Sequence, residues 1–138
     1  MTGENQAGTL NREVMGRYFA SEHTDVSGMA DDVVFTVMAS GDEYRGPQAV
    51  LGMLEYFYRG AFEATAEPRA TLVDGDHATW EGTFVGRHTG DFMGVAATGK
   101  DVRVPLCVTY DLHDRRITAG RVYLEVPTLL AQLGVSPG

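Results

Sequence analysis

The chain has 138 residues, of which 43% are hydrophobic and 22% are charged. Such values are ordinary for one globular domain and argue against a largely disordered chain. Nineteen acidic and eleven basic residues give a net charge of −8, which disfavours binding to nucleic-acid backbones and to anionic membrane surfaces.

The sequence also excludes several other classes of protein. Its longest uncharged apolar runs are far shorter than the ~20 residues that a membrane-spanning helix needs. The N-terminal segment has neither the basic start nor the apolar stretch of a secretory signal. The single cysteine, Cys107, can form neither an internal disulfide nor a cysteine-based zinc site. We therefore expect a soluble, cytoplasmic domain that acts on a small molecule and binds neither nucleic acid nor membrane.

The N-terminal third of the chain is predicted to be mainly helical. Residues 1–8 are polar or small and are expected to be frayed, so that a single domain spans residues 9–138. The spacing of apolar residues predicts a helix over 10–19 and a short second helix over 26–33. Residues 33–38 are β-branched and aromatic, which predicts a strand.

The clearest predicted helix begins at Gly46-Pro47, because proline needs no partner for its missing N–H at the first helical position. Apolar residues from Val50 to Ala61 then keep to one face of a helical period. From residue 67 the apolar period changes to two, which predicts strands. The elements predicted beyond this point are a strand that ends at an Asp74–Asp76 hairpin, a strand over 78–85, a glycine-rich loop over 86–99, strands over 102–112 and 117–125, and a helix over 127–133.

This order of elements predicts an α+β fold, in which helices pack on one face of a cone-shaped, curved antiparallel sheet. Pro105 cannot donate to a strand ladder, so we expect a bulge or an unpaired edge there. A curved sheet closed by helices leaves a cavity between the two layers, and such a cavity is a natural small-molecule pocket.

Two carboxylates are candidates for acid–base chemistry. Glu125 ends the last predicted strand, where the edge of the sheet would meet the cavity, and Glu81 lies mid-strand beside Trp80. Each side chain could face solvent, in which case the dipole of the following helix would favour the charge of Glu125. Each could instead lie in the cavity with a raised pKa, as a general acid or base requires. The spacing of the residues leaves both alternatives open.

Other motifs carry less chemical information. His88 borders the glycine-rich loop, where its ring could lean over the mouth of the cavity. The histidines show no metal-ligand spacing, so no metal site is expected. Cys107 has no cationic neighbour in the sequence that would favour a thiolate. No G-x-S-x-G elbow is present to support a serine nucleophile.

Two segments resemble a known family. Residues 88–100, HTGDFMGVAATGK, are similar to the H-x-G-x-x-x-G-x-x-x-T-G-[RK] segment of SnoaL-like polyketide cyclases, and residues 129–134, LLAQLG, resemble that family's closing L-L-x-Q-L-G. The family belongs to the nuclear transport factor 2-like superfamily, together with ketosteroid isomerases and limonene-type epoxide hydrolases. The resemblance is specific over residues 77–134 and weaker over 10–70.

The resemblance implies a cone-shaped fold, a homodimer, and a cofactor-free reaction on a polyketide-like or steroid-like molecule in secondary metabolism, such as antibiotic biosynthesis. In these cyclases an aspartate nine residues before the final glycine of Q-L-G is the catalytic acid/base. That position is Glu125 here, one methylene longer than aspartate. The family's tryptophan four residues earlier is replaced by Arg121, and the preceding strand offers no partner histidine.

Three functions remain as hypotheses. The first is a cyclase or isomerase that removes a proton next to a carbonyl. The second is epoxide hydrolysis or epoxide-opening cyclisation, with Glu125 and Glu81 as the acid and base. The third is a binding protein without catalysis. The catalytic residues expected are Glu81, His88 and Glu125, and the substrate-binding residues expected are Tyr18, Tyr58, Trp80, Cys107, Thr109 and Tyr123.

Overall fold

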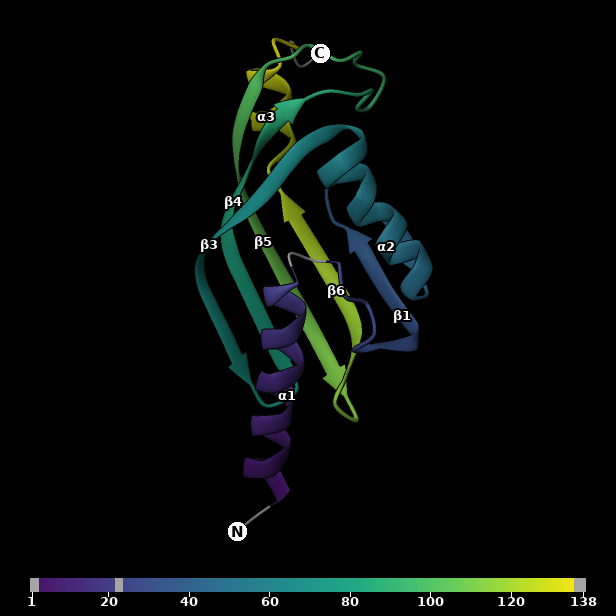
Figure 1. Cartoon of the computed structure of the whole chain (residues 1–138), viewed down its shortest axis with the longest axis vertical. Coiled ribbons are helices and arrows are strands. Elements are labelled where there is room, and N and C mark those ends of the chain that lie inside the picture. The colour runs from purple at the N-terminus through teal and green to yellow at the C-terminus, as the bar shows by residue number, and fades with distance from the viewer. Residues whose placement is uncertain (1–2, 22–23, 136–138) are drawn as a thin grey trace.

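The computed structural model describes residues 3–21 and 24–135, with side chains from Leu10 onward (Figure 1). In this part of the chain the elements are, in order, α1 (Gly3–Ala20), β1 (Met29–Val37), β2 (Asp42–Arg45), α2 (Pro47–Glu55), the π-helical turn η1 (Tyr56–Gly60), β3 (Phe62–Asp74), β4 (His77–His88), β5 (Asp101–His113), β6 (Arg116–Leu124) and α3 (Val126–Gln132). The first helix begins at Gly3, inside the segment 1–8 that the sequence predicts to be frayed and before the predicted helix over 10–19. Residues 1 and 2 of that segment lie outside the described residues.

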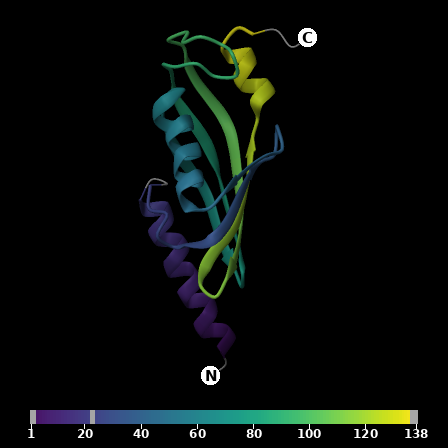
Figure 2. The ribbon, with the colours of Figure 1, turned by 90° about the vertical axis from the view of Figure 1, so that its right-hand side faces the viewer.

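The six strands form one curved sheet in the order β2-β1-β6-β5-β4-β3. All neighbours are antiparallel except β1 and β6, which are parallel. Helices α1 and α2 lie on one face of this sheet, and α3 lies at one end of it, near the connection between β4 and β5 (Figures 1 and 2). The predicted α+β fold is therefore confirmed, with a mixed sheet in place of a wholly antiparallel one.

The predicted helix over residues 26–33 is wrong, because β1 already begins at Met29. From Val33 onward the burial alternates, with Val33, Phe35 and Val37 facing the core. This alternation has the period of a strand. The spacing of apolar residues in 26–33 fits a helix equally well, and the β-branched residues that follow decide the outcome.

Two strands also differ from the prediction: one was not predicted, and the other begins earlier than predicted. Strand β2 was not expected, because its four residues are polar and mostly exposed, as suits a short edge strand. Strand β3 begins at Phe62 rather than at 67, and it carries Pro68 because it lies at the other edge of the sheet.

The pairing register decides which side chains face the helices. Trp80 pairs with Val108, and both are buried on the inner face, which α1 and α2 cover. The neighbouring residues along these strands, Glu81 and Cys107, pair with each other, and Cys107 also pairs with Tyr123, so that the three form the adjacent row on the outer face. No helix in the described part of the chain covers this outer face (Figure 2). Odd-numbered residues therefore point away from the interior in the paired parts of β4 and β5 and in β6 from Ala119 onward, whereas a register shift turns Ile117 of β6 into the core.

Pro105 lies within the sheet, in register with Thr83, and not at a bulge or on an edge strand. Its missing N–H falls where β6 ends. The Glu125 N–H donates to the Pro105 carbonyl at 3.3 Å, while the Glu125 carbonyl accepts from the Leu129 N–H of α3 at 3.0 Å. Since Pro105 cannot donate in return, the ladder stops at Leu124 and Glu125 becomes the N-cap residue of α3.

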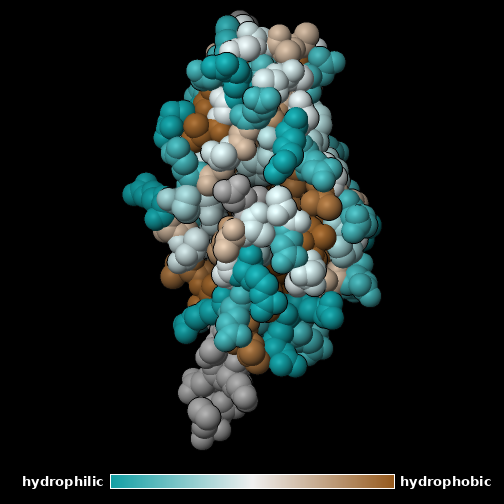
Figure 3. Space-filling model, viewed as in Figure 1, coloured by the Kyte–Doolittle hydropathy of each residue, from teal (hydrophilic) through white to brown (hydrophobic). Residues whose placement is uncertain are grey.

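The core between sheet and helices is rich in aromatic rings. Tyr110 of β5 lies 5.8 Å from the ring of Tyr18 and 6.0 Å from that of Phe35, both in edge-on arrangements. Gly120 leaves room for the Phe35 ring, because a Cβ at position 120 would lie 2.6 Å from it. Hydrophilic side chains cover most of the helix-bearing face, with apolar atoms showing between them (Figure 3).

Within the described residues, no helix combines the length and the apolar character needed to cross a membrane.

Candidate functional site

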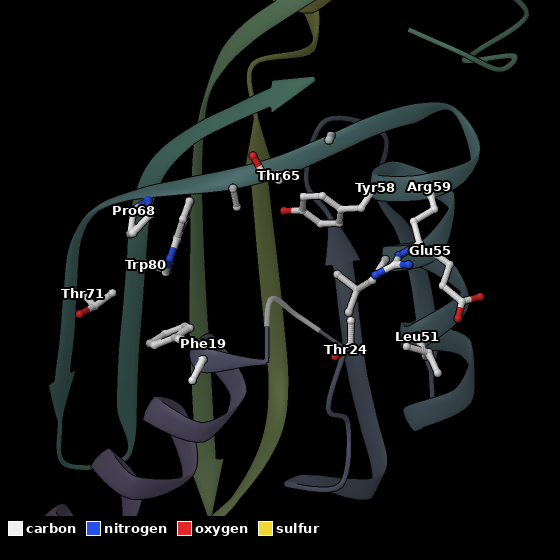
Figure 4. Close-up of a pocket in the computed structure, with 14 residues that line it drawn as sticks. Phe19, Thr24, Leu51, Glu55, Tyr58, Arg59, Thr65, Pro68, Thr71 and Trp80 are labelled. Atoms are coloured by element: carbon white, nitrogen blue, oxygen red, sulfur yellow. The ribbon is translucent and has the colours of Figure 1, made fainter. Parts of the chain in front are cut away.

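A cavity of about 750 Å³ opens on the helix-bearing side of the sheet (Figure 4). Its volume lies in the range of sites for drug-sized ligands. Phe19 at the end of α1, Leu51 and Leu54 of α2, Tyr58 of η1 and Trp80 of β4 form its largely apolar walls. Small residues of β3 complete the wall and leave the space open: Ala64, Ala66 and Pro68.

The π-helical turn brings polar groups to this cavity. The Ala61 N–H donates to the Tyr56 carbonyl at 2.7 Å, five residues back, which defines the wider turn. Turns of this kind often occur at functional sites. Figure 4 shows the Tyr58 hydroxyl and the Arg59 guanidinium directed over the cavity, whereas the Glu55 carboxylate turns away from it. Glu55 is the only carboxylate among the described residues that line the cavity.

Three tyrosines lie close together beneath the cavity. Tyr58 and Leu54 also line a second, smaller space of about 30 Å³, which Tyr18 and Tyr110 enclose from the interior. Burial raises the pKa of all three phenols far above the usual value. These phenols therefore stay protonated and serve as neutral hydrogen-bonding groups, not as bases.

Two of the predicted substrate-binding residues, Tyr58 and Trp80, line the cavity, and a third, Tyr18, lines the inner space. Sequence reasoning missed Glu55 and Arg59. A signal for both was present, because they follow Leu51 and Leu54 on a helix whose last turn carries aromatic residues. Among the described residues, no three His, Cys, Asp or Glu side chains are grouped so that they could hold a metal ion.

The placement expected for Glu125 is wrong. Its side chain is exposed at the start of α3 and is not among the residues that line the cavity. This position corresponds to the solvent-facing alternative, in which the dipole of α3 favours its charge.

Four more predicted site residues lie on the outer face of the sheet. Glu81, Cys107 and Tyr123 form one row there, and Tyr123 is 44% exposed. Burial, followed by the nearby charge of Glu81, raises the pKa of the Cys107 thiol, so this group is not an activated nucleophile. Thr109 accepts a hydrogen bond from Nε of Arg121 at 2.9 Å. None of these four residues lines the cavity.

A sequence model of the SnoaL-like polyketide cyclases matches residues 21–133 of the chain. The chain belongs to this family. A comparison with curated protein sequences finds no match.

Solved structures show that the SnoaL-like fold is shared over nearly the whole chain. A proposed SnoaL-like polyketide cyclase from Jannaschia sp. CCS1 is 20% identical, with a TM-score of 0.81 and 94% of each chain covered. IdmH from Streptomyces antibioticus, a proposed polyketide cyclase, is 25% identical, with a TM-score of 0.70 and coverage of 91% of this chain and 99% of its own. AclR from Streptomyces galilaeus, a proposed hydroxylase, is 20% identical, with a TM-score of 0.71 and coverage of 97% and 99%.

The first SnoaL-like motif fixes a loop. His88 is fully buried rather than at the mouth of the cavity, and its Nδ1 accepts the Thr98 N–H at 3.1 Å. The N–H of Gly90 donates to the Ala61 carbonyl at 3.0 Å. A Cβ at position 90 would collide with the Gly60 carbonyl, so glycine is required. The histidine, glycine and threonine of this motif therefore hold the loop against η1, and His88 has no contact with the cavity in the described structure.

The closing SnoaL-like motif fixes α3. Gln132 accepts the Arg103 N–H at 2.9 Å and donates to the Arg103 carbonyl at 2.8 Å, which imitates strand pairing at the end of the sheet. Lys100 donates from Nζ to the Leu133 carbonyl at 3.3 Å, while Leu129 is fully buried. Both motifs that identify the family thus stabilise architecture, and neither supplies a group to the cavity.

Proposed function

We propose that this SnoaL-like chain binds a polyketide-like or steroid-like molecule in the cavity and catalyses ring closure or isomerisation by way of an enolate. The observation that carries the proposal is the Tyr58 hydroxyl, which points into an apolar cavity of about 750 Å³. Removal of a proton next to a carbonyl places negative charge on the carbonyl oxygen. A neutral phenol in an apolar site donates a hydrogen bond to that oxygen and lowers the barrier. Tyr18 and Tyr110 lie with Tyr58 around the smaller space beneath the cavity.

The proton acceptor that we propose is Glu55, the only carboxylate among the described residues that line the cavity, and its side chain must rotate toward the cavity to act. It precedes Tyr58 by three residues along the chain, a spacing at which a rotated Glu55 side chain and Tyr58 lie near one another on the helix surface. A general base of this kind contributes typically about 10²- to 10⁴-fold to the rate. Glu125, which the family resemblance suggests, is exposed at the start of α3 and would have to act from outside the cavity.

A direct test uses β-tetralone, a bicyclic ketone with acidic protons next to its carbonyl. Its proton exchange in D₂O is followed by NMR with the wild-type protein and four variants. We expect Glu55→Gln and Tyr58→Phe each to lower the exchange rate by about 10²-fold. The matched changes on the other face, Glu125→Gln and Tyr123→Phe, should leave it unchanged. Loss of exchange in Glu125→Gln with full exchange in Glu55→Gln would overturn the assignment of the base.

A second candidate function is binding without catalysis. Its support is that the one carboxylate lining the cavity in the described structure faces solvent. In that case β-tetralone would bind, and its exchange rate would equal that in buffer for every variant. Epoxide opening has no such support, because Glu81 and Glu125, its proposed acid and base, both lie away from the cavity.

We also propose a homodimer, as the family resemblance implies, with the outer face of the sheet as the interface. The supporting observation is that half-buried side chains of this face, such as Thr83, Cys107 and Thr109, have no helix over them in the described structure. Sedimentation equilibrium should give twice the mass of one chain for the wild type. Tyr123→Lys on this face should give a single-chain mass, whereas Leu72→Lys on the edge strand β3 should not. A wild type that sediments as one chain would contradict the proposal.

A further inference from the structure

The cavity has one basic side chain among its described lining residues, Arg59. Its guanidinium extends over the cavity from η1, on the side of the Tyr58 ring opposite the hydroxyl (Figure 4). The arginines that form ion pairs in the described part of the chain are others: Arg45, Arg87, Arg103 and Arg121. Arg59 therefore presents its charge to the cavity with no carboxylate of the described residues to neutralise it.

This arrangement is unexpected in a chain with a net charge of −8. Glu55, one helical turn earlier, turns its carboxylate away from the cavity and does not form an ion pair with Arg59 (Figure 4). Arg59 is exposed at the edge of the cavity. A guanidinium is less strongly hydrated than an ammonium and offers a planar set of donors that matches the oxygens of an anion. The charge complementary to Arg59 is thus available for a ligand to supply.

The opposite wall of the cavity suits a flat ring system. Trp80 runs along the inner face of the sheet over Gly82, where a Cβ would lie 2.5 Å from the indole and would collide with the Glu67 carbonyl. Phe19 and Tyr58 add two further aromatic rings to the walls. Aromatic walls of this kind favour offset or edge-on contacts with planar rings.

We infer that the ligand of this cavity is an amphipathic anion, in which a flat apolar ring system contacts Phe19, Tyr58 and Trp80 and a carboxylate or ionised acidic hydroxyl binds Arg59. The inference rests on the proposed function, because it assumes that the cavity is the ligand site. It adds the class of substrate, and it makes Arg59 the residue that selects anionic over neutral molecules.

The test compares two fluorescent probes of the same ring system, anilinonaphthalene sulfonate and the uncharged phenylnaphthylamine. We expect wild-type protein to bind the sulfonate more tightly than the neutral probe. Arg59→Gln should weaken binding of the sulfonate by about ten- to a hundredfold, as loss of a charged hydrogen bond does, and should leave the neutral probe unaffected. Arg115→Gln in the exposed β5–β6 turn makes the same charge change away from the cavity and should change neither affinity.

Three other results would overturn the inference in distinguishable ways. Equal binding of the sulfonate by wild type and Arg59→Gln would show that the cavity does not select anions through Arg59. An equal loss in Arg115→Gln would show that overall charge, not the site, attracts the probe. Failure of wild type to bind either probe would remove the cavity as a ligand site, and the proposed function with it.

Discussion

Tyr58 connects the cavity with the interior, because it lines both the open space and the smaller one beneath it. Sequence reasoning found this residue, since an aromatic residue on the apolar stripe of a strongly periodic helix must face the core or a cavity. The same reasoning failed for Glu125. Its orientation depends on where β6 ends, and Pro105, a residue of another strand, determines that end.

A signal for the outward placement of Glu81 was nevertheless present. On β4 the buried residues are Ala78, Trp80 and Phe84, so the alternation of a strand assigns Glu81 to the other face. The sequence shows this alternation but does not show which set is covered by helices. That choice follows from packing of the whole sheet against α1 and α2.

The buried tyrosines give a prediction for alkaline pH. The chain has six tyrosines, and burial holds the pKa of Tyr18, Tyr58 and Tyr110 far above the usual value. Above about pH 10 the unfolded chain releases protons that the folded chain retains, so the free energy of unfolding must fall as pH rises. Tyrosinate absorbance should therefore show a late step that coincides with loss of the near-ultraviolet circular dichroism. Reversible ionisation of all six phenols near pH 10, with the fold intact, would contradict the burial of the three.

At the scale of elements, the two family motifs explain why the fold was predictable and the chemistry was not. His88 with Thr98 closes the loop between β4 and β5, and Gln132 with Arg103 closes α3 onto β5. Residues that make such specific backbone contacts leave a sequence pattern that identifies the fold. The residues that line the cavity have no fixed spacing and are spread over α1, α2, η1, β3 and β4, so no single motif identified them as a set.

The docking of α3 can be tested by removal of its hydrogen bonds. Gln132→Ala loses both contacts with the Arg103 backbone, and we expect the free energy of unfolding to fall by about 1 to 2 kcal/mol. Amide exchange should accelerate in α3 and at Arg103 but not in α2. The matched control is Gln48→Ala, an exposed glutamine of α2. Equal stability of the two variants would show that Gln132 does not hold α3 to the sheet.

The whole molecule has two different faces. The face with α1 and α2 contains the cavity, the aromatic walls and the phenols with raised pKa values, whereas the outer face contains the row of Glu81, Cys107 and Tyr123. The general form of this architecture, a curved sheet with helices on one side and a cavity between, followed from the order of elements alone. The assignment of carboxylates to its two faces required the register of every strand pair.

The most direct test of this division maps a bound ligand by NMR. The chain has one tryptophan, Trp80, so its indole N–H gives a single resolved signal in a ¹⁵N-labelled sample. Titration with β-tetralone should shift this signal and the backbone amides of Phe19 and Tyr58, and it should leave those of Cys107 and Glu125 in place. Shifts confined to Cys107 and Glu125, with the indole signal unmoved, would place the ligand on the outer face and contradict the account.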